Sequence, residues 1–281
     1  MSSVPSDTYL SFVLSRPLME VWNIFLLSLG RIVPAIAITP FLGGKLLSDS
    51  QKIGLGISIT LIFLPFLLVH APAAPVEFNT SFILLMIKEA LIGSLIGLLM
   101  SIPYYYTQSA GSLITHQMGA QSLQVQDPMS QTQTSPTGTL LANLLVVIFF
   151  ATGGIFFLFE GLLNSFIFIP IDGFLPSGFF SLKHPLWITF LDLANFVLKM
   201  TLQLSAPALL AMLLTDLFLG VANRMAPQVQ ITFLLYSLKA YAAIGMLALG
   251  WWLLAKQLDV EIMSWYKIFM RLIESLAKGF F

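Results

Sequence analysis

The sequence has 281 residues, of which 57% are hydrophobic and 9% charged, and its mean hydropathy is +0.90. An average soluble domain carries roughly 25% charged residues, so this composition predicts an integral membrane protein. The 13 basic and 13 acidic residues balance, which argues against a global basic field for binding nucleic acid. Cysteine is absent, and His70, His116 and His184 lie far apart in the chain, so we expect no metal site and no cofactor.

Apolar segments long enough to span a bilayer recur along the chain. A hydrocarbon core of about 30 Å requires about 20 helical residues. Six segments approach that length: 18–41, 53–70, 81–103, 140–159, 186–215 and 231–255. We therefore predict one all-α, polytopic membrane domain over residues 1–281. The apolar but proline-interrupted residues 161–185 are expected to be re-entrant or packed against a partner.

The last stretch, residues 256–281, places four cations among aromatic and aliphatic residues. This pattern predicts an amphipathic helix at a membrane surface. With six spans, the distribution of Lys and Arg favours a cytoplasmic C-terminus.

Several charges lie within or close to the predicted spans. A charge at the bilayer centre costs about 2.5–3.5 kcal/mol on insertion scales, so such residues are expected to face protein, water or one another. These charges are Arg31, Lys88, Glu89, Asp192, Lys199 and Lys239, and Lys88, Glu89 and Lys239 are interpreted as ion pairs. Lys88 and Glu89 are neighbours whose side chains diverge by about 100° on a helix, so we expect them to point at different partners. "GSLIG", residues 93–97, supplies small residues four apart for close helix contact.

The chain carries none of the common catalytic signatures. HExxH, GxSxG, a Walker A loop, GxGxxG and the paired aspartates of an intramembrane protease are all missing from the sequence. We therefore expect a non-enzymatic protein. A stand-alone proton-coupled solute transporter remains an alternative, with Asp192, Lys199 or Glu89 in a proton relay.

Five motifs in chain order carry a resemblance to a known family. They are "TPFLGG" after Pro34, "KEALIGSLIG", "SAGSLITHQMGAQSLQVQDP", "NSFIFIP" and "LGVANRMAPQVQITFLLYSLKA". Together they resemble the FliR/SctT family, the export-gate subunit of flagellar and virulence type III secretion systems. The double glycine at 153–154 is similar to the virulence branch, and the flagellar homologue is the close alternative.

The resemblance implies a fold of bent helical hairpins and a role in the bacterial inner membrane. It implies a pore for unfolded protein substrates, formed with SctR/FliP-type and SctS/FliQ-type subunits and a SctU/FlhB-type switch subunit. The positions expected to contact partners or support assembly are Arg31, Lys88, Glu89, Ser165, Pro170, Arg224, Pro227, Gln228 and Lys239.

A polar segment, residues 104–139, separates the third and fourth predicted spans. By resemblance, its central part is a plug lying across the closed pore. Its core, "HQMGAQSLQVQDPMSQTQTSPTGT", carries one ionised side chain, and neutral amides and hydroxyls would not trap charged stretches of a passing polypeptide. Connections longer than about 12–15 residues are usually functional or disordered. The expected pore and plug residues are Gln117, Met118, Gly119, Leu123, Val125, Asp127, Pro128 and Met129.

Overall fold

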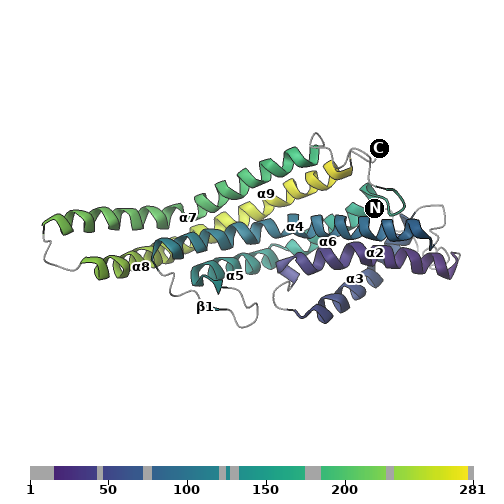
Figure 1. The fold of residues 1–281 in the computed structure, drawn as a ribbon, viewed down its shortest axis with the longest axis horizontal. Coiled ribbons are helices and arrows are strands. Elements are labelled where there is room, and N and C mark those ends of the chain that lie inside the picture. Colours follow the sequence, from purple (N-terminus) through teal and green to yellow (C-terminus); the bar gives the residue numbers. More distant parts are fainter. Residues whose placement is uncertain are drawn as a thin grey trace. The chain divides into compact units, whose positions relative to one another are not determined.

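The computed structural model describes residues 16–42, 47–71, 78–119, 125–126, 133–174, 185–225 and 231–277. The helices are α2 (Leu18–Ile38), η1 (Pro40–Leu42), α3 (Asp49–Val69), α4 (Thr80–Gln117), α5 (Pro136–Ala151), α6 (Gly154–Phe168), α7 (Pro185–Met225), α8 (Ile231–Leu249) and α9 (Trp251–Ala277) (Figure 1). The one β ladder in the described residues is a two-residue pair, β1 (Val125–Gln126) and β2 (Gln133–Thr134). The predicted all-α class is confirmed.

Four helices are long and apolar enough to cross a membrane: α2, α3, α4 and the Phe190–Met225 part of α7. Two pairs, α5 with α6 and α8 with α9, qualify when each pair is taken as one span broken at a short interruption. Four to six spans therefore occur in the described part of the chain, which agrees with about six predicted segments. The chain is a multi-pass membrane protein.

Four predicted segments differ from the helices. The segment 186–215 ends ten residues before α7 does, and 231–255 is divided at Gly250 between α8 and α9. The apolar window ended at residue 103, whereas α4 continues to Gln117. The residues after Pro103 are rich in Tyr, Thr, Gln and Ser, which lowers their hydropathy without interrupting the helix. The window 140–159 is instead divided at Thr152 and Gly153, and α6 takes the first residues of the segment expected to be re-entrant.

Prolines occur inside four helices, as Pro34 in α2, Pro65 in α3, Pro103 in α4 and Pro207 in α7. Each lacks the N–H that would bond the carbonyl four residues earlier. Helices in a membrane protein tolerate this loss because neighbouring helices and hydroxyl side chains satisfy the freed groups. Ser101 of α4 donates to the carbonyl of Ile38, the last residue of α2, where carbonyls have no partner within the helix.

The described chain divides into two compact units. Unit 1 comprises residues 1–101, 155–190 and 266–281, and unit 2 comprises residues 102–154 and 191–265. In unit 1, α2 packs against α3 and against the first part of α4. A Cβ on Gly93 would lie 2.1 Å from the Arg31 carbonyl oxygen, and one on Gly97 would lie 2.7 Å from that of Ala35. The predicted close contact through "GSLIG" is confirmed, because only glycine fits between these two backbones.

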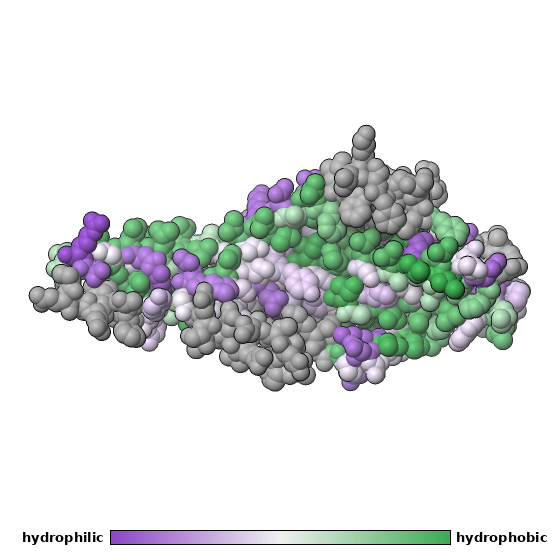
Figure 2. All heavy atoms as spheres, in the orientation of Figure 1, coloured by the Kyte–Doolittle hydropathy of each residue, from purple (hydrophilic) through white to green (hydrophobic). Residues whose placement is uncertain are grey.

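The core of unit 2 is an apolar cluster drawn from four helices. α4 and α5 contribute Ile114, Met118 and Leu141; α7 and α8 contribute Ala208, Met212, Ala243 and Leu247. Many other large apolar side chains are exposed, and Figure 2 shows them over much of the drawn face. Such exposure is costly in water, so these side chains require lipid or partner subunits around them.

Helix α9 is amphipathic, as predicted. Its apolar stripe comprises Leu258, Ile262, Trp265, Phe269, Leu272 and Ile273, and these side chains are buried in the protein. Lys256, Asp259, Lys267 and Arg271 lie on the exposed side. The expected docking of this stripe onto a membrane surface is therefore wrong, because the stripe is already occupied by packing within the chain.

Candidate functional site

Arg31, in α2, is completely buried in unit 1 and uses every donor of its guanidinium group. Its Nε lies 2.5 Å from Oε2 of Glu89, and Nη2 lies 2.9 Å from Oε1 of the same carboxylate. Nη1 donates to the carbonyl (2.8 Å) and hydroxyl (3.2 Å) oxygens of Ser165, and Nη2 also donates to the Ile169 carbonyl at 2.9 Å. The ring of Phe166 lies 4.1 Å from the guanidinium carbon. A planar group with five fixed donors suits this arrangement, whereas an ammonium does not.

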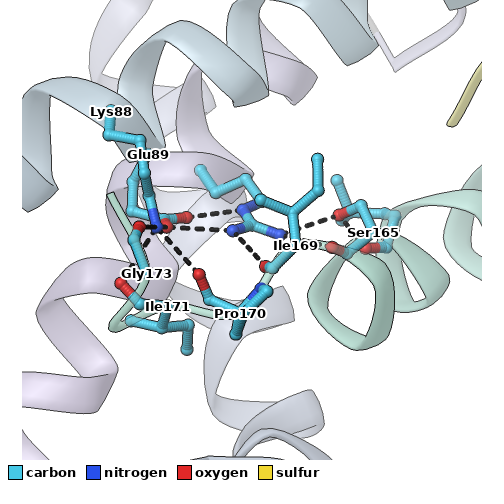
Figure 3. Close-up of polar contacts among 9 residues, drawn as sticks. Lys88, Glu89, Ser165, Ile169, Pro170, Ile171 and Gly173 are labelled. Atoms are coloured by element: carbon cyan, nitrogen blue, oxygen red, sulfur yellow. Dashed lines mark hydrogen bonds and ion pairs between the residues drawn. The ribbon is translucent and has the colours of Figure 1, made fainter. Parts of the chain in front are cut away.

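Lys88, in α4, binds the same region from a second direction (Figure 3). Its Nζ donates to the carbonyl oxygens of Pro170, Ile171 and Gly173 at 2.9, 3.0 and 2.9 Å. It also lies 2.8 Å from Oε1 of Glu89. The expectation that Lys88 and Glu89 would point at different partners is therefore wrong in part, because the long lysine chain curls back to the neighbouring carboxylate.

We call Arg31, Lys88, Glu89 and the segment 165–173 the Arg31 cluster. Two cations share one carboxylate, and backbone carbonyls at and beyond the end of α6 accept the remaining donors (Figure 3). The C-terminus of a helix is the negative end of its dipole and carries carbonyls without intrahelical partners, so it is a natural place for two cations. The cluster thus ties the end of α6 to α2 and α4.

The contacts of this cluster are internal to the chain. Arg31, Glu89 and Ser165 are 0% exposed and Lys88 is 3% exposed. The expected partner contacts of Arg31, Lys88, Glu89, Ser165 and Pro170 are corrected accordingly, because their polar atoms bind one another within unit 1. The motif residues Ser165, Phe166 and Pro170 do lie at one place. Ser165 and the Pro170 carbonyl accept hydrogen bonds from Arg31 and Lys88, and the Phe166 ring contacts the Arg31 guanidinium.

The polar passage begins at the end of α4, in unit 2. Gln117 is the last residue of α4 and is exposed. The side chain of Met118 is buried in the apolar core of unit 2, so its expected place in the pore lining is corrected. Gly119 has φ +74 and donates its N–H to the His116 carbonyl at 3.0 Å. A Cβ at Gly119 would lie 2.3 Å from the Tyr236 ring, so both the turn and the packing require glycine.

Four hydroxyl side chains join the two helices that flank the passage. The Oγ atoms of Ser112 in α4 and of Ser135 before α5 lie 3.0 Å apart. Thr137 donates to the Gly111 carbonyl at 2.6 Å and also bonds the hydroxyl of Thr115. Ser135 caps α5 by accepting from the Gly138 N–H at 3.0 Å, and Pro136 occupies the first helical position. We call Ser112, Thr115, Ser135 and Thr137 the stem.

The polar segment outside the helices is shorter than the predicted 104–139. Residues 104–117 belong to α4 and residues 136–139 to α5, so the part outside the helices is 118–135. Within it, Val125 pairs with Thr134 and Gln126 with Gln133 in the β1–β2 ladder. Leu123, Asp127, Pro128 and Met129 lie outside the described residues.

Lys239, in α8, forms an ion pair with Asp216 of α7, with Nζ and Oδ1 2.7 Å apart. This ion pair lies within unit 2, and the contact of Lys239 with a partner subunit stays a prediction. Arg224 is exposed in the last turn of α7, where a cation is favourable at the negative end of the helix dipole. Pro227 and Gln228 lie outside the described residues.

Sequence reasoning missed Asp216, Tyr236 and the stem. Asp216 lies one residue after the end of the predicted span 186–215, and no sequence pattern identifies its partner. The stem did carry a local signal, because Ser135 before Pro136 is the typical start of a helix. Among the residues that the structure describes, no group of three His, Asp or Glu side chains lies close enough to hold a metal ion.

Comparison with known proteins places these features in a wider group. The sequence profile of the family described as bacterial export proteins, family 1, matches residues 22–264. The chain is 30% identical over 233 residues to the Yop proteins translocation protein T of Yersinia pestis, covering 82% of this chain and 85% of that protein.

Relatives from other bacteria match with similar coverage. The surface presentation of antigens protein SpaR of Salmonella typhimurium is 28% identical over 219 residues, covering 78% of this chain and 79% of that protein. The flagellar biosynthetic protein FliR of Escherichia coli is 27% identical over 251 residues, with 88% of each chain covered. The match thus includes α2 through most of α9, and with it the Arg31 cluster and the stem.

Proposed function

Since the chain belongs to the bacterial export proteins of family 1, we propose that it is the export-gate subunit of a type III secretion apparatus. In this role it forms a pore for unfolded proteins together with SctR/FliP-type and SctS/FliQ-type subunits, and a SctU/FlhB-type switch subunit binds the assembly. The observation that carries the proposal is the match over 243 residues, from 22 to 264, to one family. The many exposed apolar side chains support assembly with membrane partners.

The virulence branch is the form of the apparatus that we favour. The Yersinia relative is named for translocation of Yop proteins, and the Salmonella relative SpaR is named for surface presentation of antigens. The double glycine at 153–154 also supports the virulence branch. The flagellar alternative has its own support in the FliR relatives of Escherichia coli and Bacillus subtilis.

The apparatus resides in the bacterial inner membrane, with the C-terminus of this subunit in the cytoplasm. The multi-pass helical architecture supports the membrane location, and the distribution of Lys and Arg along the sequence supports the orientation. Export itself requires no catalytic residue in this chain, because the subunit acts through shape and packing.

The passage between α4 and α5 closes the pore before export. Its sequence is nearly free of charge, so it obstructs ions without holding charged stretches of a substrate. The stem supports this role, because hydroxyl hydrogen bonds hold the two ends of the passage together. The close packing of Gly119 against the Tyr236 ring also supports a fixed start of the passage, directly after α4.

A deletion tests the gate. Removing residues 120–126 deletes β1 but spares Met118, Gly119 and the stem, so α4 and α5 keep their contacts while the passage between them is shortened. The assembled apparatus carrying this deletion is expected to leak ions, measured as loss of membrane potential in cells that express all subunits. A potential equal to that of cells with the unaltered subunit contradicts the gate.

A solute transporter is the second candidate, and the geometry gives it less support. Glu89 is enclosed by two cations in the Arg31 cluster. Asp192 and Lys199 are exposed on α7, and no ion pair joins them in the part of the chain that the structure describes. A transporter would be stable alone or as a small homo-oligomer, whereas an export-gate subunit requires its partners.

A further inference from the structure

An apolar groove lies between α3 and α6, within unit 1. It has a volume of about 690 Å³. Its apolar lining consists of Ile59, Ile62, Phe63, Phe66, Phe156, Phe159 and Leu163. Two polar residues of α6, Glu160 and Asn164, line the same groove. They are four residues apart and therefore share one face of the helix.

The polar pair lies beside α3, a helix long and apolar enough to cross a membrane. Glu160 follows Phe159, whose ring contacts Phe63 edge-on with the ring centroids 5.5 Å apart. Phe63 is six residues before the end of α3 at Val69, or about 9 Å along the helix axis. The carboxylate is thus adjacent to the inner turns of a span and not to its end.

Glu160 and Asn164 are poorly satisfied by the chain itself. Glu160 is exposed, and it accepts one hydrogen bond, from the hydroxyl of Tyr266 at 2.8 Å. Among the described residues no cation lies within ion-pair distance of Glu160. The Asn164 side chain donates no hydrogen bond there either. A carboxylate can accept about four hydrogen bonds and an amide can donate two, so most of this capacity is open.

Lipid does not suit this groove. Acyl chains fill the aromatic part but offer no donor to a carboxylate, and an ionisable residue facing hydrocarbon is expensive. Intramembrane carboxylates normally pair with other protein groups. A helix that lies in an apolar groove and presents a polar side chain to its polar edge satisfies both parts.

We propose that the α3–α6 groove receives a transmembrane helix of another subunit of the apparatus. That helix carries Lys, Arg or an amide or hydroxyl donor opposite Glu160 and Asn164, and aliphatic or small residues opposite the phenylalanines. The proposal rests on the proposed function, since it requires a membrane partner, and it identifies the chemistry of the contact. The hydroxyl of Tyr266 holds the carboxylate toward the groove before the partner binds.

Photo-crosslinking in the assembled apparatus tests the occupant of the groove. A photoreactive phenylalanine analogue replaces Phe156, which lines the groove and is 74% exposed, and in a matched strain it replaces Ile83 of α4, which is 59% exposed and lies outside the groove. The expected result is an adduct with another apparatus subunit at Phe156 and none with that subunit at Ile83. An adduct with lipid alone, or with a second copy of this chain, overturns the proposal.

A second experiment removes the charge of Glu160 and tests the polar contact. Glu160→Leu is expected to reduce recovery of the crosslinked partner about tenfold, because the partner's donor would then face an apolar side chain. Glu274→Leu, at an exposed carboxylate of α9, is the matched control and is expected to leave recovery unchanged. Equal recovery from Glu160→Leu and from the unaltered chain overturns the assignment.

Failure of the proposed function is distinguishable from failure of the groove. If the unaltered chain co-purifies with no other apparatus subunit, the proposed function fails. If it co-purifies with them while the Phe156 adduct contains lipid alone, the groove assignment fails and the proposed function stands.

Discussion

Arg31 shows how a single residue can be indispensable without touching a substrate. Its five donors meet one carboxylate, one hydroxyl and two backbone carbonyls, and no solvent reaches them. Removing one partner of a buried ion pair is much more costly than the pair itself is favourable, since the remaining charge stays buried. Lys88 alone would then have to balance Glu89 while it also binds three carbonyls.

Arg31→Leu is therefore expected to destabilise the subunit by about 3–5 kcal/mol. The measurement is the thermal unfolding temperature of the purified apparatus in detergent, together with the amount of subunit that accumulates in the membrane. Lys52→Ala is the control, because Lys52 pairs with an Asp49 side chain that is 95% exposed, and its loss should cost less than about 0.5 kcal/mol. Equal unfolding temperatures for the two variants would refute the structural role of Arg31.

At the scale of the elements, α2 and α4 approach closely enough that side chains are excluded from one line of contact. Gly93 and Gly97 face the carbonyls of Arg31 and Ala35. This contact places Glu89, one helical turn before Gly93, beside the guanidinium of Arg31. The Arg31 cluster therefore depends on the close packing of α2 against α4.

Gly93→Ala is expected to separate α2 from α4 and to lower the unfolding temperature, because its Cβ would have to occupy space within 2.1 Å of a backbone oxygen. Gly54→Ala in α3 is the matched change, since nothing lies within 4 Å of the added methyl group. Alanine is favoured over glycine inside a helix by about 1 kcal/mol, so Gly54→Ala should be neutral or stabilising. A Gly93→Ala subunit as stable as the Gly54→Ala subunit would contradict the close contact.

The stem makes a separate prediction about motion. If only the passage between α4 and α5 moves during export, the stem can be locked without loss of function. Cysteines at Ser112 and Ser135, whose hydroxyl oxygens are 3.0 Å apart, are expected to form a disulfide. The natural chain has no cysteine, so no competing disulfide arises within it.

Secretion by the locked apparatus is the readout, compared under oxidising and reducing conditions and with each single cysteine variant. We expect equal secretion in all of them. Secretion that stops on oxidation and returns on reduction would show that α4 and α5 separate at the stem during export.

At the scale of the whole molecule, much of the architecture could be predicted from local sequence. Apolar windows predicted about six helical segments. The cost of charges in a membrane predicted that residues such as Arg31 would face protein, water or one another, with Lys88, Glu89 and Lys239 in ion pairs. The partners of these charges could not be predicted from the sequence, because Arg31 binds a serine 134 residues away and Lys239 binds Asp216 on a different helix. Such contacts depend on how helices pack, and no single window of sequence contains them.

Helix ends were the other limit. Hydropathy measures how well a segment suits lipid, and it does not measure helix formation. Helix α4 therefore continues through the more polar residues from Tyr104 to Gln117, where the apolar window had ended. The same reasoning assigned buried charges to partner subunits, when the chain satisfies them internally. The part of the site that the motifs located correctly is the segment from Ser165 to Pro170, which meets Arg31 and Lys88.

Co-purification tests the central claim most directly. The tagged subunit is expressed in bacteria with and without the subunits proposed as its partners, and the detergent-solubilised material is analysed for mass and composition. The account predicts a stable complex with those subunits and aggregation or degradation of the chain expressed alone, because its apolar surface and the Glu160 groove would be uncovered. A stable, folded monomer or homo-oligomer from the chain alone, with no affinity for the partner subunits, would contradict it.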